Sequence, residues 1–422
     1  MENYTIILLI LVLMISASAA AGWLKLPVPV LLILVGIAIG FVPSIPNIGI
    51  DPDIIMLLFL PPLLYDAAFN ISFPDFKTNI STIGTLATGL VFLTTVGIAV
   101  VAHYLVPGMT WPLSFVLGSI LSATDAVAAM GITKGLGLPH RTTTILEGES
   151  LVNDASALVA YRFSVAAVTG SVFVFWKALL QFWLVLGGGF VVGVALAWLL
   201  AMAVRLFRDN DMVVISLMLL MPFITYLVAE HFEVSGVIAV VVLGLGMSKL
   251  SRAKFPEALR QQSRNFWDVN IFLLNGLIFV LIGLQFPIVM KQMDVAQVGR
   301  YAGYAAVITV VAFGVRLLRV LLQQANLARA FKKKNTRIKE EALFDSRTSL
   351  IITWAGMRGI VSLAIAIGLP VLLENGKPFP MRNEILFLSI SVVLFSLLGQ
   401  GLTLPWVVRR AGRVSGDKVD IS

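Results

Sequence analysis

The feature that most constrains this chain of 422 residues is the recurrence of apolar runs, each close to the length that spans a lipid bilayer. Inside a bilayer every backbone N–H and C=O group needs a partner within the protein, so these runs are expected to be helices. About thirteen such runs follow one another, with short polar segments between them. The predicted membrane spans are residues 4–24, 27–44, 53–70, 80–106, 111–131, 143–168, 172–204, 211–231, 234–249, 265–287, 300–328, 348–373 and 383–408.

Composition is typical of an all-α polytopic membrane protein, because 58% of the residues are hydrophobic and only 13% are charged. No polar block is long enough to form a soluble domain. We therefore expect a single transmembrane domain over residues 1–422, ending in a short basic tail at 409–422. The first span lacks the basic segment of a signal peptide, and we expect it to be retained. The absence of cysteine excludes disulfides, thiolate metal sites and cysteine nucleophiles.

Lysine and arginine are distributed unequally between the two alternating sets of loops. Under the predicted spans, 22 of these residues lie in one set, 4 lie in the other and 5 lie within spans. The positive-inside rule then predicts a multi-pass protein of the inner cell membrane, with its N-terminus outside and its C-terminus in the cytoplasm. Because the charge follows this alternation, the net charge of +8 indicates membrane topology and contact with lipids rather than nucleic-acid binding.

The fifth and twelfth spans are each interrupted by a short polar segment, at 122–125 and at 356–359. These spans hold corresponding places in two six-helix halves, which predicts inverted repeats whose broken helices cross at the middle of the membrane. We expect Asp125 to compensate positive helix N-termini at the crossing and Arg358 to compensate negative C-termini. The alternative is a pair of ordinary kinks, each with its own buried polar partners.

An acidic run opens the sixth span, and helical geometry sorts its side chains onto two faces. Glu147, Ser150 and Asp154 share one stripe, whereas Glu149 and Asn153 share the adjoining one. A helix N-terminus favours acidic side chains, which accounts for Glu147 and Glu149 in the simplest interpretation. Asp154 lies two turns further in, where an ionised side chain costs a few kcal/mol, so a functional role is favoured for it.

The third span adds Asp66 directly after two prolines, and the set of candidate oxygen ligands is then Asp66, Asp154, Ser150 and Thr124. Hard monovalent cations such as sodium and lithium prefer such ligands. A carboxylate that is removed from water holds either a proton or a cation, but not both, which is the simplest basis for exchange. Asn153 beside Asp154 is neutral, which is consistent with one proton for each cation.

Together these motifs strongly resemble the NhaP/NHE-type cation:proton antiporters over essentially the whole chain. The segments that carry the resemblance are Glu147–Asp154, Thr124–Asp125, Pro61–Asp66 and Trp354–Gly359. The resemblance implies a transporter without a cofactor, rather than an enzyme, that exchanges one sodium or lithium ion for one proton without net charge movement. Roles in pH homeostasis and sodium tolerance are expected to follow from that exchange.

The resemblance also implies thirteen helices, a homodimer and two parts within each protomer. A mobile core of about residues 80–168 and 300–408 is expected to slide, like an elevator, against a dimerisation scaffold of about 4–70 and 172–287.

The resemblance further assigns roles to the candidate ligands. It implies that Asp154 binds the ion and the proton, with Ser150 and both the backbone and the side chain of Thr124 as co-ligands. Asp66 matches a carboxylate that is often glutamate in the family, so it is expected to coordinate the ion directly or through a water. Asn153 is expected to anchor the unwound segment.

The remaining charged residues are implied to be structural partners. Glu149 is expected to pair with Arg316, with Arg319 as the alternative, and Arg358 is expected to stabilise the helix crossing. Arg162 lies two turns beyond Asp154, and the spacing does not choose between a structural and a functional role for it.

Other functions fit the sequence less well. A channel would use the same polar core without coupling. An intramembrane aspartyl protease using Asp125 and Asp154 lacks a Gly-x-Gly-Asp element, and nucleotide-driven transport lacks a Gly-x-x-x-x-Gly-Lys motif. His103, His140 and His231 are expected to be interfacial or turn residues, so we attribute any pH dependence to proton competition at Asp154.

Overall fold

A computed structural model of the chain describes residues 2–24, 26–42, 52–133, 140–168, 175–332, 346–373 and 376–413. These residues are mainly helical, and the pairing of extended backbone among them is one isolated bridge between Leu372 and Pro378. The helices are α1 Glu2–Leu24, α2 Val28–Gly40, α3 Pro52–Asn70, α4 Phe73–Leu105, α5 Trp111–Ile120, α6 Ala126–Thr133, α7 His140–Val168, α8 Phe175–Leu206, α9 Asp211–His231, α10 Gly236–Lys254, α11 Glu257–Lys291, α12 Val295–Lys332, α13 Ser346–Trp354, α14 Ile360–Ile367, α15 Arg382–Ser396, the π-helix Leu397–Gly401 and α16 Leu402–Arg413.

Within the described ranges, eight helices are long and apolar enough to cross a membrane, and shorter apolar helices accompany them. A helix or a pair of half-helices lies at each predicted span. The all-helical membrane fold is thus observed, whereas the total of thirteen crossings and the inverted repeat stay predictions.

Several helices are longer than the apolar runs that predicted them. The tenth predicted span begins at residue 265, but α11 begins at Glu257, and α10 continues to Lys254 rather than ending at residue 249. An apolar run marks the part of a helix that lies in lipid. Polar residues that favour helix formation, such as Glu, Gln and Arg, extend the same helix into water.

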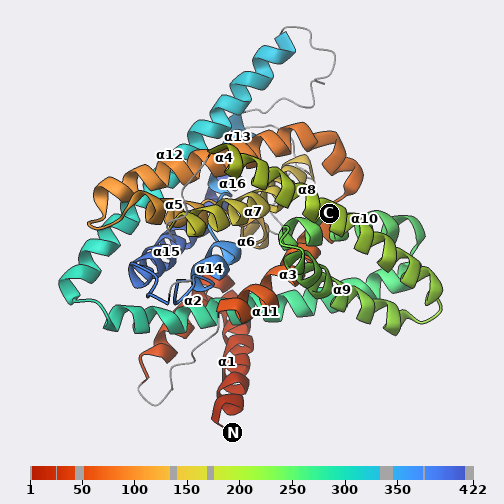
Figure 1. The fold of residues 1–422 in the computed structure, drawn as a ribbon, viewed down its shortest axis with the longest axis horizontal. Helices are drawn as coiled ribbons and strands as arrows, with labels where there is room; N and C mark the ends of the chain where they lie inside the picture. The colour runs from red at the N-terminus through yellow and green to blue at the C-terminus, as the bar shows by residue number, and fades with distance from the viewer. Residues whose placement is uncertain are drawn as a thin grey trace.

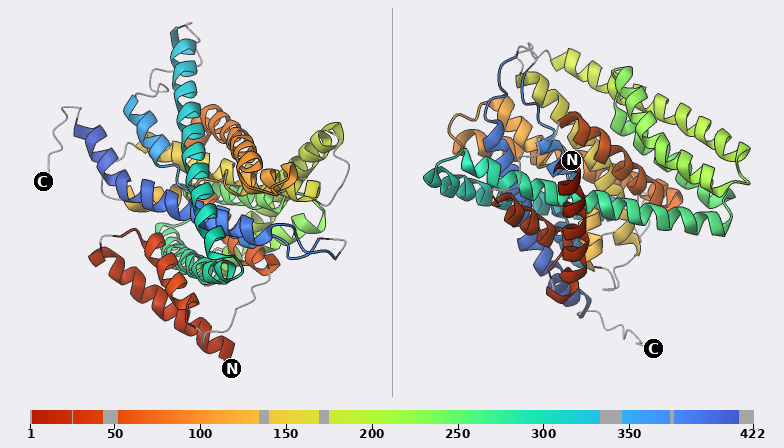
Figure 2. Two further views of the ribbon diagram at one scale, coloured as in Figure 1. Left: turned by 90° about the vertical axis from the view of Figure 1, so that its left-hand side faces the viewer. Right: turned by 90° about the horizontal axis from the view of Figure 1, so that it is seen from below.

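The predicted division into a core and a scaffold sorts the helices into two groups, and this division stays a prediction, since α11 contacts α14 and α15 as well as α1, α2 and α3. The α7 group consists of α4–α7 and α12–α16, and the α11 group consists of α1–α3 and α8–α11. Figure 1 shows α8, α9 and α10 together at one end of the molecule and α11 running across its lower part, with α1 extending below it. The left view in Figure 2 shows α12 projecting beyond its neighbours. The two groups meet where α3 and α11 contact α14, where α11 contacts α15 and where α10 contacts α7.

Close backbone approach holds the α11 group together at its centre. α2 packs along α11, and a Cβ atom added to Gly36 or to Gly283 would overlap the backbone of the other helix. Small residues at such crossings let helices pack tightly in lipid, where apolar burial supplies little driving force. α11 is thereby fixed against its own group while its other side faces α14.

Candidate cation site

Two interrupted helices meet in the α7 group, at the points that the sequence predicts. The first break separates α5 from α6, and the second separates α13 from α14. The Asp125 backbone N–H donates to the Met357 carbonyl at 2.7 Å, and the Ser362 hydroxyl donates to the Ala123 carbonyl at 3.2 Å. The two breaks therefore bind each other directly, as crossed helices require, and are not independent kinks.

Asp125 lies at the two helix N-termini of the crossing. Its Oδ1 accepts from the backbone N–H of Ala128 in α6 at 3.0 Å, and its Oδ2 accepts from that of Ile360 in α14 at 3.3 Å. A Cβ atom on Gly359 would overlap the Asp125 carboxylate, so only glycine allows this close approach. One carboxylate thus compensates the positive ends of two helices.

Arg358 lies at the two opposite helix ends. Its Nε donates to the Leu121 carbonyl, which follows α5, at 3.1 Å, and its Nη1 donates to the Gly356 carbonyl, which follows α13, at 3.4 Å. Both carbonyls lack a helical partner, and the guanidinium provides one together with a compensating positive charge. The complementary placement of Asp125 and Arg358 is the arrangement that their charges predict.

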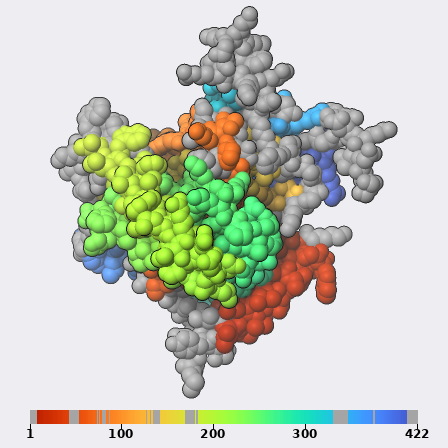
Figure 3. All heavy atoms as spheres, turned by 90° about the vertical axis from the view of Figure 1, so that its right-hand side faces the viewer, coloured from red at the N-terminus to blue at the C-terminus, as the bar shows by residue number. Residues whose placement is uncertain are grey.

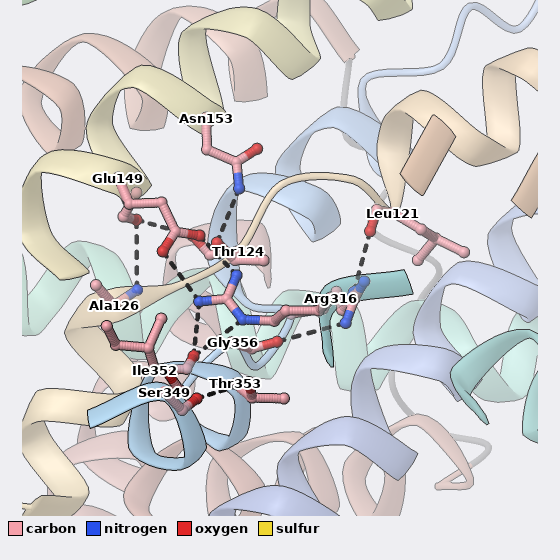
Figure 4. Close-up of polar contacts among 12 residues, drawn as sticks. Leu121, Thr124, Ala126, Glu149, Asn153, Arg316, Ser349, Ile352, Thr353 and Gly356 are labelled. Atoms are coloured by element: carbon pink, nitrogen blue, oxygen red, sulfur yellow. Dashed lines mark hydrogen bonds and ion pairs between the residues drawn. The ribbon is translucent and has the colours of Figure 1, made fainter. Parts of the chain in front are cut away.

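Glu149 pairs with Arg316 in a fully buried ion pair (Figure 4). Arg316 Nη1 lies 2.6 Å from Glu149 Oε1, and Nη2 lies 3.1 Å from Oε2. Nε and Nη2 also donate to the Ile352 carbonyl, at 3.0 and 2.9 Å. A Cβ atom on Gly356 would overlap this guanidinium, so glycine makes room for it. The pair connects α7, α12 and α13 within one group.

Arg319, the alternative partner for Glu149, lies elsewhere. Its Nη1 donates to Gln323 Oε1 at 3.2 Å, and its Nη2 donates to the Thr85 carbonyl at 2.5 Å. Arg316 and Arg319 are three positions apart, on adjoining parts of one face of α12, yet the neighbours that they contact differ. The helix turns Arg316 toward α7 and Arg319 toward α4.

Three polar residues attach the first break to α7. The Ser150 hydroxyl donates to the Thr124 carbonyl at 2.8 Å and accepts from the Ala126 backbone N–H at 3.3 Å. The Asn153 amide donates to the Thr124 hydroxyl at 2.8 Å (Figure 4). Asn153 therefore anchors the unwound segment, as expected, and Ser150 also satisfies an N–H at the start of α6.

The four candidate ligands line one cavity beside the crossing. Asp66 from α3, Thr124 from the first break, and Ser150 and Asp154 from α7 all contribute to its wall. Asp154 is buried, and its Oδ1 has no hydrogen-bond partner among the described residues. Asp66 accepts from the Asn70 amide at 2.9 Å. The cavity thus holds an unpaired carboxylate oxygen surrounded by hydroxyl, carbonyl and carboxylate groups.

This donor set suits a hard, weakly charged cation. The described residues contain no cluster of three or more His, Cys, Asp or Glu side chains that would hold a metal ion. Oxygen ligands of mixed kind are those that alkali cations accept, whereas transition metals favour imidazole and thiolate.

Sequence reasoning missed two polar residues of the cavity wall, Ser362 on α14 and Asn275 on α11. Asn275 has apolar residues on either side of it at 271–274 and 277–284, and an amide in the most apolar part of the tenth predicted span was the signal that could have identified it. Its helix belongs to the α11 group, so the wall of the cavity comes from both groups.

Arg162 forms an ion pair with Glu230 of α9, and each side chain is 35% exposed. It does not line the cavity of Asp154. The pair joins α7 to the α11 group, in contrast to the Glu149–Arg316 pair, which lies inside the α7 group.

Two of the three histidines have described side chains, and both lie away from the cavity. The His103 ring stacks on Trp111 and its Nδ1 lies 2.8 Å from the Met109 carbonyl, near the end of α4. His140 begins α7 and His231 ends α9. Neither His103 nor His231 lines the cavity, and both lie near helix ends as predicted, whereas the prediction for His140 falls on a side chain outside the described set.

Comparison with known proteins points to one family. The family model described as sodium/hydrogen exchanger, transmembrane, matches residues 7–410. The chain is 34% identical over 386 residues to the uncharacterized Na+/H+ exchanger YjcE of Escherichia coli, covering 87% of this chain and 70% of that protein. It is 35% identical over 379 residues to the sodium, potassium, lithium and rubidium/H+ antiporter of Bacillus pumilus, covering 88% of this chain and 56% of that protein.

A solved structure shares the fold. The sodium proton antiporter MjNhaP1 from Methanocaldococcus jannaschii aligns with a TM-score of 0.70 at 22% sequence identity, covering 95% of this chain and 99% of that one.

Proposed function

Because the chain belongs to the sodium/hydrogen exchanger family, we propose that it is a secondary active transporter that exchanges Na+ or Li+ for H+ across the membrane. The observation that carries the proposal is the buried, unpaired Asp154 Oδ1 in an oxygen-lined cavity at the crossing of two broken helices. Broken helices that meet at membrane depth are typical of sites where ions bind within transporters.

Asp154 differs from the other charged groups of the crossing because its charge has no fixed partner there. Arg316 compensates Glu149, and Asp125 and Arg358 compensate helix ends. Asp154 instead takes up a cation or a proton, and a bare anion is costly to move through lipid. The two ions therefore compete for one site, and a loaded or protonated site is the form that crosses the membrane.

One proton is exchanged for each cation in this proposal. Asn153, beside Asp154, donates an amide N–H to Thr124 and carries no proton that can be exchanged. Exchange at Asp154 alone is then electroneutral. Thr124, Ser150 and Asp66 complete the ligand set in this proposal, with Asp66 bound directly or through a water.

Alternating access is proposed to arise from an elevator-like movement of the α7 group against the α11 group. The ligands Asp154, Ser150 and Thr124 all belong to the α7 group, and the Glu149–Arg316 pair holds that group together. These three ligands can therefore travel as a unit, whereas Asp66, on α3 of the α11 group, would stay behind.

A homodimer formed through the α11 group is also proposed. The most apolar window of α8 is only 17% buried within one chain, and Figure 3 looks onto the face to which α8 contributes. This face is available to lipid and to a second copy.

The proposed orientation follows from the positive-inside rule: the N-terminus is outside the inner membrane and the C-terminus is cytoplasmic.

Proton flux in sealed proteoliposomes tests the proposal. Na+, Li+ or K+ is added in turn to the wild-type protein, to Asp154→Asn and to Asp209→Asn, a matched change at a side chain that is 93% exposed. K+ is included because the name of the B. pumilus relative includes potassium. We expect cation-driven proton movement in the wild type and in Asp209→Asn, and none in Asp154→Asn.

Two outcomes would contradict the proposal. Flux that persists in Asp154→Asn would place the site elsewhere. Cation movement without proton movement would identify a channel. Valinomycin with a potassium gradient sets the membrane potential, and the exchange rate is then compared at different potentials. This tests stoichiometry, because the rate of electroneutral exchange does not respond to the membrane potential.

A further inference from the structure

The cavity around Asp154 is lined by a second buried oxygen that has no hydrogen-bond partner in the described structure, the carboxamide Oδ1 of Asn275 on α11. We propose that Asn275 is a further ligand for the alkali cation and that the α11 group supplies it only in the conformation seen here. The proposal rests on the cation/proton exchange proposed above and adds a residue to that site.

The hydrogen bonds around the cavity favour this atom over its neighbours. The Ser150 hydroxyl and the Thr124 carbonyl bind each other, and the Thr124 hydroxyl accepts from Asn153. The Ser362 hydroxyl donates to the Ala123 carbonyl. Among the buried side-chain oxygens of the described lining, those of Asp154 and Asn275 remain without a partner.

A purely structural role does not explain Asn275. A structural asparagine in an apolar helix joins two elements through its carboxamide, and a buried carboxamide oxygen that stays unpaired destabilises the fold. Here the oxygen meets no donor from α3 or α14, the two neighbours that α11 approaches at the cavity. Ile271, one turn earlier on α11, lines the same cavity, so this stripe of α11 faces the site.

The chemistry of a carboxamide suits a monovalent cation. Its oxygen is a hard neutral ligand of the kind that coordinates alkali and alkaline-earth ions. It adds a coordinating atom without adding a negative charge or an exchangeable proton. Asn275 therefore strengthens cation binding at Asp154 while leaving the ratio of protons to cations unchanged.

The position of Asn275 makes its contribution depend on the side from which the cation binds. Asp154, Ser150 and Thr124 lie in the α7 group, whereas Asn275 lies in the α11 group. When the α7 group moves, Asn275 is left behind. Asp66 and the cavity lie toward the end of α3 that the charge distribution predicts to be cytoplasmic. Loss of Asn275 should therefore weaken cation binding from the cytoplasmic face.

Three variants test the proposal. Asn275→Leu keeps the approximate size of the side chain and removes the oxygen, whereas Asn275→Asp keeps an oxygen at the same place. Asn270→Leu is the matched control, because Asn270 lies on the same helix but does not line the cavity. Proton flux is measured against Na+ concentration in everted vesicles, where the cytoplasmic face is outside, and in right-side-out vesicles.

We expect Asn275→Leu to raise the apparent KM for Na+ about fivefold to tenfold in everted vesicles, as loss of one neutral ligand allows. The maximal rate and the KM in right-side-out vesicles should stay close to wild type. Asn275→Asp should keep a low KM, and Asn270→Leu should match the wild type. A second measurement, the rise in melting temperature that Na+ causes in detergent, should be reduced in Asn275→Leu and retained in Asn275→Asp.

An unchanged cytoplasmic KM in folded Asn275→Leu would overturn the proposal, and so would an equal change on both faces. If Asn275→Leu does not fold, Asn275→Asp takes its place in the test. A KM for Na+ that is higher in Asn275→Asp than in the wild type would also count against a ligand role. Wild-type protein without cation-driven proton flux would instead refute the proposed function itself, so the two failures are distinguishable.

Discussion

The two stripes of α7 each carry a buried carboxylate, and the two carboxylates differ in whether the protein compensates their charge. Glu149 is 1% exposed and Asp154 is 9% exposed, so both carboxylates are withdrawn from water. Glu149 has both oxygens bound by Arg316, whereas Asp154 keeps one oxygen without a partner in the described chain. The same helix thus carries one negative charge that the protein compensates permanently and one that it leaves to a mobile ion.

This difference separates stability from transport. A buried ion pair contributes little net stability when it forms, but loss of one partner is costly because the other charge stays buried. Substitution of Glu149 should therefore be felt in folding measurements, and substitution of Asp154 only in measurements that involve the cation.

The largest effect on stability is expected for Arg316→Ala. This change strands the Glu149 carboxylate and leaves the Ile352 carbonyl without its guanidinium donor. We expect a loss of about 3–5 kcal/mol in the free energy of unfolding, together with loss of transport. Thermal or denaturant unfolding of the purified protein in detergent measures the first effect.

The double variant Glu149→Gln with Arg316→Gln provides the control, because it removes both charges and should recover part of the lost stability. Stable and fully active Arg316→Ala protein would show that Glu149 does not depend on this arginine.

A smaller loss is expected for Asp125→Ala at the helix crossing. The change removes the acceptors for the N–H groups of Ala128 and Ile360, each at a helix N-terminus. Loss of one such cap costs about 0.5–2 kcal/mol, so two caps predict a loss of about 1–4 kcal/mol. Unfolding measurements on Asp125→Ala and Asp125→Asn test this, since the amide keeps one acceptor oxygen. Equal losses in the two variants would argue that the charge, and not the hydrogen bonds, is what matters.

The sequence predicts these charge partners because a buried charge permits few arrangements. Asp125 and Arg358 follow from the helix ends that each break must create, and Glu149 requires a cation at membrane depth. The choice between Arg316 and Arg319 depends on how α12 is rotated against α7, and that rotation is set by packing among helices far apart in the chain. Two arginines three positions apart look equivalent in the sequence for that reason.

Neutral and distant partners were harder to predict. Asn275 carries no charge, so its position in an apolar run does not demand an explanation in the way that Asp154 does. Arg162 was recognised as unusual, but its partner Glu230 lies on α9, and spacing along the chain does not identify such a contact. The ends of α10 and α11 were missed because hydropathy reports membrane depth rather than helix length.

Arg162 lies on the same helix as Glu149 and forms an ion pair with Glu230 of α9. This pair is more exposed to solvent than the Glu149–Arg316 pair. Each side chain is 35% exposed, compared with 1% and 2% for Arg316 and Glu149. Solvent screening should limit the cost of Arg162→Gln to about 0–1 kcal/mol. A double-mutant cycle with Glu230→Gln measures the coupling. A coupling as large as that between Glu149 and Arg316 would mean that water does not reach this pair.

The smallest effect on stability is expected for Asp154→Asn, although this change should abolish transport. The amide removes a buried charge that no basic side chain pairs with among the described residues and leaves the neighbouring hydrogen bonds of Ser150 and Asn153 in place. Without added cation the free energy of unfolding should therefore change by less than about 0.5 kcal/mol or increase slightly.

The contrast should appear when Na+ is added, since a ligand that binds only the folded protein stabilises it by mass action. Na+ should raise the melting temperature of the wild type, and more so at higher pH, where fewer protons compete for Asp154. The Asp154→Asn variant should not respond to Na+ at any pH, whereas an exposed control such as Asp209→Asn should respond like the wild type. A full Na+ response in Asp154→Asn would mean that the unpaired oxygen on this stripe is not where the cation binds. The Asp66 carboxylate on α3, which lines the same cavity, would then be the next candidate for the cation ligand.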